Sequence, residues 1–167
     1  MRPGTAAATD PLVGDMILFA ALTGLRRGEM LRLTPESIRG NLLVLGSNTK
    51  SGKPRGIPMP PEAARIARRR IPWQVSPSLL RKRWDAARVA VGLPLIRWHD
   101  LRHTYASWLV QDGVDLYAVS LLLGHSDVRV TQRYAHLAPA HLEEAVGHLP
   151  SLRGKGGGKP RAKKKAA

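Results

Sequence analysis

Four side chains in the second half of the sequence have the chemistry to act on a phosphate ester. His99 and Arg102 are three residues apart, His125 follows a glycine, and Tyr134 comes nine residues later. At these spacings one compact helical unit can bring two imidazoles, a guanidinium and a phenol to a single point. The set therefore combines a cation for an anionic substrate, groups that transfer protons, and a nucleophile.

Two further cations come from the first half of the chain. Arg26 has Glu29 three residues after it as a candidate brace, and Lys50 lies at the tip of a predicted β-hairpin. Two guanidiniums can hold the non-bridging oxygens of one phosphodiester and neutralise the charge that develops as phosphorus becomes five-coordinate. Because this removes the need for Mg²⁺, we expect no metal and no cofactor.

A tyrosine needs help to act as a nucleophile, because its pKa of about 10 leaves only about one phenol in a thousand ionised at neutral pH. A nearby histidine suits this task, and a lysine on a hairpin can protonate the leaving alkoxide as a general acid. Attack by Tyr134 would leave a phosphotyrosine and a free hydroxyl. That intermediate conserves the phosphodiester energy for rejoining, so nothing like ATP is needed.

Each candidate also has an ordinary structural interpretation. His99 can be a structural histidine, Arg26 can form a simple intrahelical ion pair, and Tyr134 can be a core aromatic with a satisfied hydroxyl. His125 can cap a helix end, and Lys50 can be a solvated turn residue. The functional hypothesis depends on the candidates occurring together and in order.

Composition favours a polyanionic partner. Lys and Arg number 27 against 12 acidic residues, a formal net charge of +15. Seven of those bases lie in residues 151–167, so the remaining 20 still exceed the 12 acids by eight in residues 1–150. The absence of cysteine excludes a disulfide framework and a thiolate nucleophile. With no signal-peptide pattern and no apolar run near the ~20 residues that span a bilayer, we expect a cytoplasmic, nucleoid-associated protein.

The elements that position these residues are mostly helices. Asp10 and Pro11 start a helix that Gly24 ends, and the period changes after Asn41 to that of a β-hairpin. A short helix is expected to follow Gly24, in LRRGEMLRLTPESI. The remaining helices are expected at 61–70, 79–91, 99–111, 115–124, from 126 through Tyr134, and from 139 onward. In helix 99–111 we expect Trp108 to be buried. The fold class is mainly α with a small antiparallel β-sheet (α+β).

Four segments of the chain resemble the signature blocks of the tyrosine recombinase, or phage integrase, catalytic domain, whose fold is that of DNA breaking-rejoining enzymes. They are TGLRRGEMLRL, NTKSGKPRGIPM, HDLRHTYASWL and LLGHSDVRVTQRYAH, and the similarity covers roughly residues 10–146. No candidate position departs from the family's usual residue.

The resemblance implies a role for each candidate. Arg26 and Arg102 clamp the phosphate, His99 and His125 hydrogen-bond it and assist proton transfer, Lys50 protonates the leaving 5′ oxygen, and Tyr134 forms a 3′-phosphotyrosyl DNA intermediate. Glu29 supports the site, Lys53 is close enough to Lys50 to be the general acid instead, and His103 is assigned to packing or bracing.

The resemblance also implies an organisation around double-stranded DNA. We expect a leader at 1–9, a catalytic domain at 10–150 and a disordered basic tail at 151–167. Only about nine residues precede the first helix, so we expect a catalytic unit that lacks the family's core-binding domain and grips DNA weakly. The side chains expected to contact the DNA backbone are Arg65, Arg68, Arg69, Arg81, Lys82 and Arg83. Assembly is expected as a tetramer on DNA, through exchange of a helix with an apolar stripe at Leu142, Ala145, Val146 and Leu149.

The function expected from the sequence is therefore site-specific DNA recombination by an enzyme. Two alternatives are open: a basic DNA-binding module without catalysis, and a nicking-closing enzyme like type IB topoisomerases. The complete candidate set argues against the first alternative, and the second imidazole at His125 argues against the other.

Overall fold

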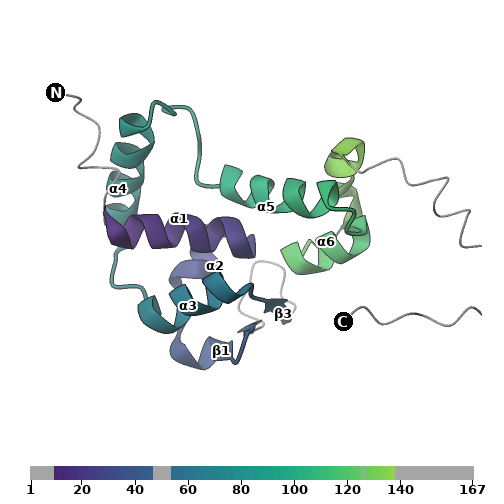
Figure 1. Ribbon diagram of the computed structural model, residues 1–167, viewed down its shortest axis with the longest axis horizontal. Helices are drawn as coiled ribbons and strands as arrows, with labels where there is room; N and C mark the ends of the chain where they lie inside the picture. Colours follow the sequence, from purple (N-terminus) through teal and green to yellow (C-terminus); the bar gives the residue numbers. More distant parts are fainter. Residues whose placement is uncertain (1–9, 47–53, 126, 138–167) are drawn as a thin grey trace, which may run out of the picture.

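The computed structural model describes residues 10–46, 54–125 and 127–137 of the chain. Within them the protein is mainly helical with one small antiparallel sheet, as the sequence predicted. Figure 1 shows helix α1 lying between α5 on one side and α3 on the other. The elements are α1 (Pro11–Thr23), α2 (Arg27–Leu31), η1 (Pro35–Ser37), β1 (Ile38–Arg39), β2 (Leu42–Leu45), β3 (Arg55–Pro58), α3 (Pro61–Arg70), α4 (Pro77–Ala90), α5 (Asp100–Gln111), α6 (Leu116–Leu123), η2 (Val128–Val130) and η3 (Gln132–Leu137).

Local signals set both ends of the central helix α1. The Asp10 carboxylate accepts hydrogen bonds from the backbone N–H groups of Leu12 at 3.0 Å and Val13 at 3.3 Å. Gly24 ends the helix at φ 63°, a left-handed conformation that favours glycine. A Cβ at this position would also lie 2.4 Å from the Tyr105 ring. The close packing of α1 against α5 therefore requires glycine at position 24.

The sheet has the order β1-β2-β3 with antiparallel pairing throughout. Leu43 and Leu45 of β2 and Ile57 of β3 are buried, and the residues between them are more exposed, which is the alternation expected of a half-buried sheet. The predicted hairpin is β2 and β3, while the two-residue β1 was not predicted.

The described residues form two apolar clusters. One joins α1, the sheet, α3 and the start of α4, and the other joins α5, α6 and η3. The largest members of the first include Met16, Phe19, Leu43, Ile66 and Leu80, and those of the second include Tyr105, Val110, Val119, Leu123 and Tyr134. Tyr134 thus belongs to the smaller cluster and takes its position from it.

Two sequence-based expectations were wrong. Trp108 is 53% exposed, because the buried face of α5 runs through Arg102, Tyr105, Ala106 and Val110 and leaves position 108 on the adjacent face. Tyr134 lies in the 3₁₀ segment η3 rather than in an α-helix.

Several predicted features lie outside the described residues. They are the leader 1–9, Lys50 and Lys53 in the β2–β3 connection, the helix from 139 with its Leu142 stripe, and the tail 151–167. In the parts that are described, no helix has the length and apolar character needed to cross a membrane.

Candidate active site

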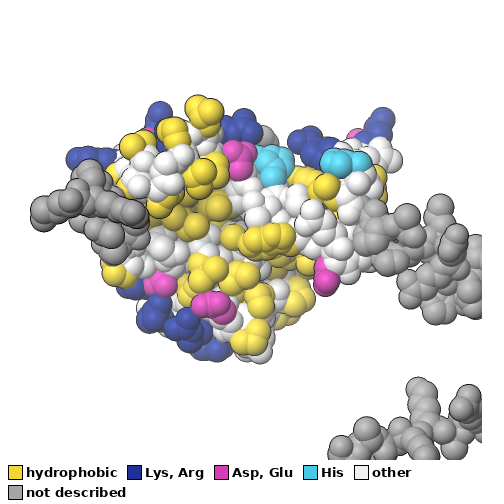
Figure 2. Space-filling view, turned by 45° about the horizontal axis from the view of Figure 1, so that its top comes forward, with side chains coloured by type: hydrophobic (Ala, Val, Ile, Leu, Met, Phe, Trp, Pro, Cys, Tyr) yellow, Lys and Arg dark blue, Asp and Glu magenta, His cyan; other side chains and the backbone are white. Residues whose placement is uncertain are grey.

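A cavity of about 260 Å³ lies beside Tyr134 of the second cluster. Its lining brings together five of the six predicted catalytic residues, while the sixth, Lys50, lies outside the described residues. Figure 2 shows histidine side chains along the upper edge of one face of the molecule, with Lys and Arg side chains beside them. The cavity is lined by Arg26, His99, Arg102, His103, His125, Val130, Arg133 and Tyr134.

Arg102 is the buried arginine that lines the cavity. Its guanidinium is buried and donates to the backbone carbonyl of Gly24 at 2.7 Å and to that of Leu123 at 2.6 Å. These carbonyls belong to the C-terminal ends of α1 and α6, where the helix dipoles favour a cation. Burial and the nearby Arg26 charge lower the pKa of Arg102 to about 10, so the guanidinium is still charged at neutral pH. Arg102 therefore orients a positive charge toward the cavity and ties the two clusters together.

Glu29 holds a second guanidinium at the cavity. Its carboxylate accepts from the Arg26 side chain at 3.1 Å and from the Arg26 backbone N–H at 2.9 Å, which also caps α2. Burial alone raises the pKa of Glu29, but hydrogen bonds from Arg55 and from the Arg26 backbone outweigh burial and lower the pKa below its ordinary value. The carboxylate is thus ionised at neutral pH and offsets part of the positive charge around it.

Arg55, which sequence reasoning missed, connects the hairpin to this site. Its guanidinium donates to Glu29 at 2.9 Å and to the Leu122 carbonyl at 3.2 Å, and its side chain is 9% exposed. Strand pairing places Arg55 opposite Leu45, so these two residues mark the ends of the connection that contains Lys50. The ends of that connection are therefore anchored beside Glu29 and α6.

His125 is held by Thr131, a second residue that sequence reasoning missed. The Nδ1 atom of His125 lies 2.8 Å from the Thr131 hydroxyl, which is fully buried. When the threonine hydroxyl donates to Nδ1, the proton of the neutral ring lies on Nε2 and can be donated to a ligand. Burial and the charges of Arg102, Arg26, Arg133 and Arg55 lower the pKa of His125 to about 4. The ring is therefore neutral at physiological pH in the absence of an anion.

His99 and His103 lie one turn apart at the start of α5. Their rings meet edge to face with centroids 4.8 Å apart, and the Nδ1 atom of His103 is hydrogen-bonded to the Tyr134 hydroxyl. Burial raises the pKa of Tyr134, although the charges of Arg133 and Arg102 act in the opposite direction. The phenol is accordingly protonated at neutral pH and in contact with an imidazole.

Arg133 is a cavity-lining residue that sequence reasoning did not select. Its Nε donates to the Val130 carbonyl at 3.0 Å, and the side chain is largely exposed. The position directly before the tyrosine was a signal that could have identified it. With Arg26 and Arg102 it makes three guanidiniums around one cavity, an arrangement suited to a phosphate or another oxyanion.

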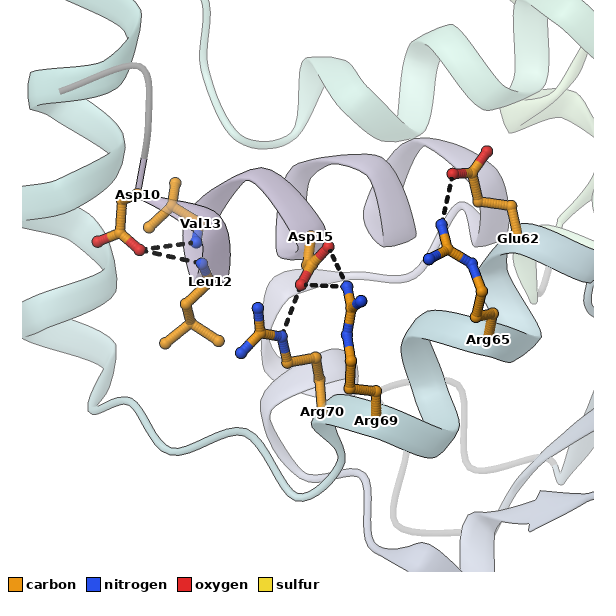
Figure 3. A network of polar contacts seen from close by, with 8 residues as sticks. All are labelled: Asp10, Leu12, Val13, Asp15, Glu62, Arg65, Arg69 and Arg70. Atoms are coloured by element: carbon orange, nitrogen blue, oxygen red, sulfur yellow. Dashed lines mark hydrogen bonds and ion pairs between the residues drawn. The ribbon is translucent and has the colours of Figure 1, made fainter. Parts of the chain in front are cut away.

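The predicted DNA-backbone residues lie on α3 and α4. Arg65, Arg68 and Arg69 are on α3, which Figure 1 places across α1 from α5. Figure 3 shows Asp15 between Arg69 and Arg70, with the Arg69 guanidinium 2.8 Å from both carboxylate oxygens. Burial raises the pKa of Asp15, but these arginine hydrogen bonds outweigh it and lower the pKa. Arg69 therefore shares one carboxylate with Arg70, which offsets part of their combined positive charge.

The other predicted DNA-backbone residues differ in whether a carboxylate pairs with them. Arg65 pairs with Glu62 at 3.1 Å (Figure 3), and Arg68 contacts the Asn41 side chain at 3.5 Å. Arg83 pairs with Asp10 at 3.1 Å, and Arg81 is 4.0 Å from Asp85. Lys82 is exposed on α4. Direct contact of this set with DNA stays a prediction.

Comparison with known proteins gives consistent matches. The family model described as "Phage integrase family" matches residues 72–141. The integrase of Salmonella phage P22 is 32% identical over 166 residues, covering 84% of this chain and 43% of that protein. The tyrosine recombinase XerD of Lacticaseibacillus casei is 32% identical, covering 87% of this chain and 58% of that protein.

Among solved structures, the catalytic domain of bacteriophage HP1 integrase is similar to this chain over almost its whole length. The TM-score is 0.66 at 30% sequence identity, covering 87% of this chain and 86% of that one. By contrast, the chain spans about half the length of the curated relatives it matches. The chain is therefore similar to a part of each of those proteins, and to a solved catalytic domain over most of its length.

Proposed function

This chain belongs to the phage integrase family of tyrosine recombinases, and from that premise we propose that it cleaves and rejoins DNA strands at specific sites through a 3′-phosphotyrosyl intermediate. The observation that carries the proposal is the single cavity in which Arg26, Arg102, His99 and His125 surround the hydroxyl-bearing side chain of Tyr134. A scissile phosphate in this cavity would meet cations, neutral imidazoles and a nucleophile at once.

The contacts of the cavity residues support the role proposed for each. Arg102 and Arg26, held by backbone carbonyls and by Glu29 respectively, bind the non-bridging oxygens of the phosphate. His99 and His125 donate hydrogen bonds to the same oxygens. Preorganised donors of this kind stabilise the charge that develops in the transition state, because they need no reorganisation during the reaction.

The cleavage step balances without an external reactant. The Tyr134 oxygen bonds to phosphorus as the bond from phosphorus to the 5′ oxygen breaks. The phenol proton passes to an imidazole of the cavity as the new bond forms, and the leaving oxygen takes a proton from Lys50, with Lys53 as the alternative donor. The reverse attack of the 5′ hydroxyl rejoins the strand. We propose that the arginines supply the charge stabilisation that a metal ion gives in other phosphoryl-transfer enzymes, so that the reaction is metal-independent.

Double-stranded DNA is the proposed partner. Basic side chains outside the cavity would neutralise phosphates and make binding salt-dependent. Arg81 and Lys82 are the most available of the predicted set, because Arg65, Arg69 and Arg83 are each paired with a carboxylate within about 3 Å. We propose that Arg68 and the basic residues of 151–167 add further phosphate contacts. A protein with this activity is expected in the cytoplasm, at the nucleoid.

We also propose an assembly for recombination. The catalytic unit is residues 10–150, flanked by the leader 1–9 and the tail 151–167. It acts as a tetramer on two duplexes, in which the segment with Leu142, Ala145, Val146 and Leu149 passes between subunits. A core-binding domain, in a longer polypeptide or a separate one, supplies the additional DNA contacts that tight binding requires.

Covalent trapping tests the proposed activity. The protein is incubated with a nicked suicide duplex that carries the attachment site of the element encoding it, and adducts are resolved on a denaturing gel. Tyr134→Phe should abolish the adduct. Tyr117→Phe is the matched control, since Tyr117 is 59% exposed and does not line the cavity.

The outcomes separate the three candidate functions. An adduct that Tyr134→Phe abolishes, followed by exchange of strands between two duplexes, supports recombination. Relaxation of supercoiled plasmid of any sequence, without strand exchange, would favour a nicking-closing enzyme. DNA binding in a native gel with no adduct, even with a core-binding domain supplied, would identify a non-catalytic binding module.

A further inference from the structure

His103 makes a contact that the proposed mechanism leaves unused. It lies on α5 directly after Arg102, and its Nδ1 atom is hydrogen-bonded to the Tyr134 hydroxyl, the atom that attacks phosphorus. The two ring centroids are 6.0 Å apart with an interplanar angle of 46°. Among the described residues, His103 is the one hydrogen-bond partner of this hydroxyl. His103 therefore touches the atom that the proposed function makes the nucleophile.

Tyr134 requires a proton acceptor in its protein environment. Burial raises its pKa, and the neighbouring charges of Arg133 and Arg102 do not reverse that effect. The phenol must therefore lose its proton during attack rather than before it. The acceptor has to be within hydrogen-bond reach of the hydroxyl at that moment.

The other two cavity histidines are engaged elsewhere. His125 uses its Nδ1 atom for the buried Thr131 hydroxyl at 2.8 Å. His99 meets the edge of the His103 ring, with centroids 4.8 Å apart, and has no hydrogen bond to Tyr134 among the described contacts. Of the three imidazoles, only His103 has a ring nitrogen on the phenol.

The surroundings of His103 keep its ring ready to accept a proton. Burial lowers its pKa, and the charges of Arg133, Arg97 and Arg102 lower it further, while Asp100 raises it. His99 is the remaining titratable neighbour. The neutral ring can accept through Nδ1 when its own proton is on Nε2. After transfer, the Asp100 charge partly stabilises the imidazolium that forms.

We propose that His103 is the general base of strand cleavage, taking the Tyr134 proton on Nδ1 as the tyrosine oxygen bonds to phosphorus. This assignment rests on the proposed function. The phosphorus–O5′ bond breaks in the same step, and the O5′ oxygen takes its proton from the general acid, Lys50. In rejoining, the 5′ hydroxyl returns its proton to Lys50 as it attacks, and His103 returns its proton to the departing phenolate, so protons and charges balance over the cycle.

The test is the pH dependence of adduct formation under single-turnover conditions on the suicide duplex. In the wild type, the rate should fall at acid pH as His103 becomes protonated. His103→Asn keeps a polar amide close to the Nδ1 position but cannot take a proton. We expect the variant to be slower by about 10²–10⁴-fold at pH 7, with a rate that rises with pH toward the tyrosine pKa.

A modified leaving group separates this role from that of the general acid. A 5′-bridging phosphorothiolate leaves as a thiolate and needs no proton. It should restore cleavage by Lys50→Ala and leave His103→Asn impaired. Restoration of His103→Asn to the wild-type rate would overturn the proposal, because His103 would then act on the leaving group.

Two further measurements exclude a purely structural role. Imidazole added to His103→Ala should increase the rate in proportion to its neutral form, and thermal unfolding and DNA affinity of His103→Asn should match the wild type. A wild-type pH profile in His103→Asn, or an equal loss at every pH, would overturn the proposal. If wild-type protein itself forms no adduct, the proposed function fails, whereas failure of the His103 assignment alone leaves wild-type cleavage and the Tyr134→Phe result intact.

Discussion

Glu29→Gln tests whether a buried carboxylate holds the cationic site together. The Glu29 side chain is 2% exposed and lies 3.1 Å from the Arg26 guanidinium and 2.9 Å from that of Arg55. Glutamine keeps the size of the side chain and one acceptor oxygen but removes the negative charge. The Arg26, Arg55 and Arg102 guanidiniums, which all interact electrostatically around this carboxylate, then repel one another.

The size of the effect follows from burial. Removing one partner of a buried ion pair costs about 3–5 kcal/mol, because the other charge remains buried. Arg26 is 27% exposed and partly solvated, so Arg55, at 9%, carries most of the loss. We therefore expect the free energy of unfolding to fall by about 3 kcal/mol, which lowers Tm by about 10 °C for a domain of this size.

Glu62→Gln is the matched control. Glu62 pairs with Arg65 at the same i,i+3 spacing and the same 3.1 Å distance, but the two side chains are 51% and 61% exposed. Exposed pairs contribute about 0–1 kcal/mol, since water and salt screen the charges. The comparison thus sets a buried carboxylate held by Arg26 and Arg55 against an exposed carboxylate paired with Arg65.

Urea unfolding at pH 7.5, followed by tryptophan fluorescence, measures both variants. The native pKa of Glu29 is lowered from 4.5, so its stabilising contribution is present above pH 4.5 and is lost as pH falls through the lower native value. The difference in free energy of unfolding between wild type and Glu29→Gln should disappear over that acid range. If Glu29→Gln lowers the free energy of unfolding at pH 7.5 by no more than Glu62→Gln does, Glu29 is not the residue that stabilises the cationic site.

Three further predictions concern other parts of the molecule. Gly124→Ala should destabilise the fold by about 1–3 kcal/mol in urea unfolding, because the residue has φ 64° and a Cβ would lie 2.6 Å from the Arg55 guanidinium; Gly14→Ala, with open space around it, is the control. His125 has a native pKa of about 4, so between pH 6.5 and 4 the unfolded chain binds more protons and the free energy of unfolding decreases as the pH is lowered. His125→Gln should make this decrease shallower in urea unfolding, and an unchanged slope would contradict the pKa shift. Arg81→Ala with Lys82→Ala should reduce the slope of log affinity against log salt by about 2 in fluorescence anisotropy, whereas an unchanged slope would place these side chains away from the DNA.

Much of the fold could be read from local signals. Asp10 caps α1, Ser76 caps α4 and Asp115 caps α6, each through hydrogen bonds to backbone N–H groups two or three residues ahead. Gly24 and Gly124 end α1 and α6 in left-handed conformations. Such signals act within one turn of the chain, which is why the helix boundaries agreed with the sequence to within a few residues.

Local patterns failed where packing selects among similar faces. Trp108 has the composition of a core residue, yet the face of α5 that meets α1 is set by Arg102 and Tyr105 and excludes it. Likewise, a cap at Asp127 was compatible with an α-helix, and the backbone forms 3₁₀ turns instead. Neither outcome depends on the residues adjacent in sequence.

By itself, the sequence determined the inventory of the site: which side chains could bind a phosphate, move protons and attack, and in which order they occur. The tertiary structure decided their connections. The Arg102 contact with the Gly24 carbonyl spans 78 residues, the Arg55 contact with the Leu122 carbonyl spans 67, and His103 reaches Tyr134 across 31. Contacts at such separations form only when elements far apart in the sequence pack against each other, because no local propensity encodes the distance between their surfaces.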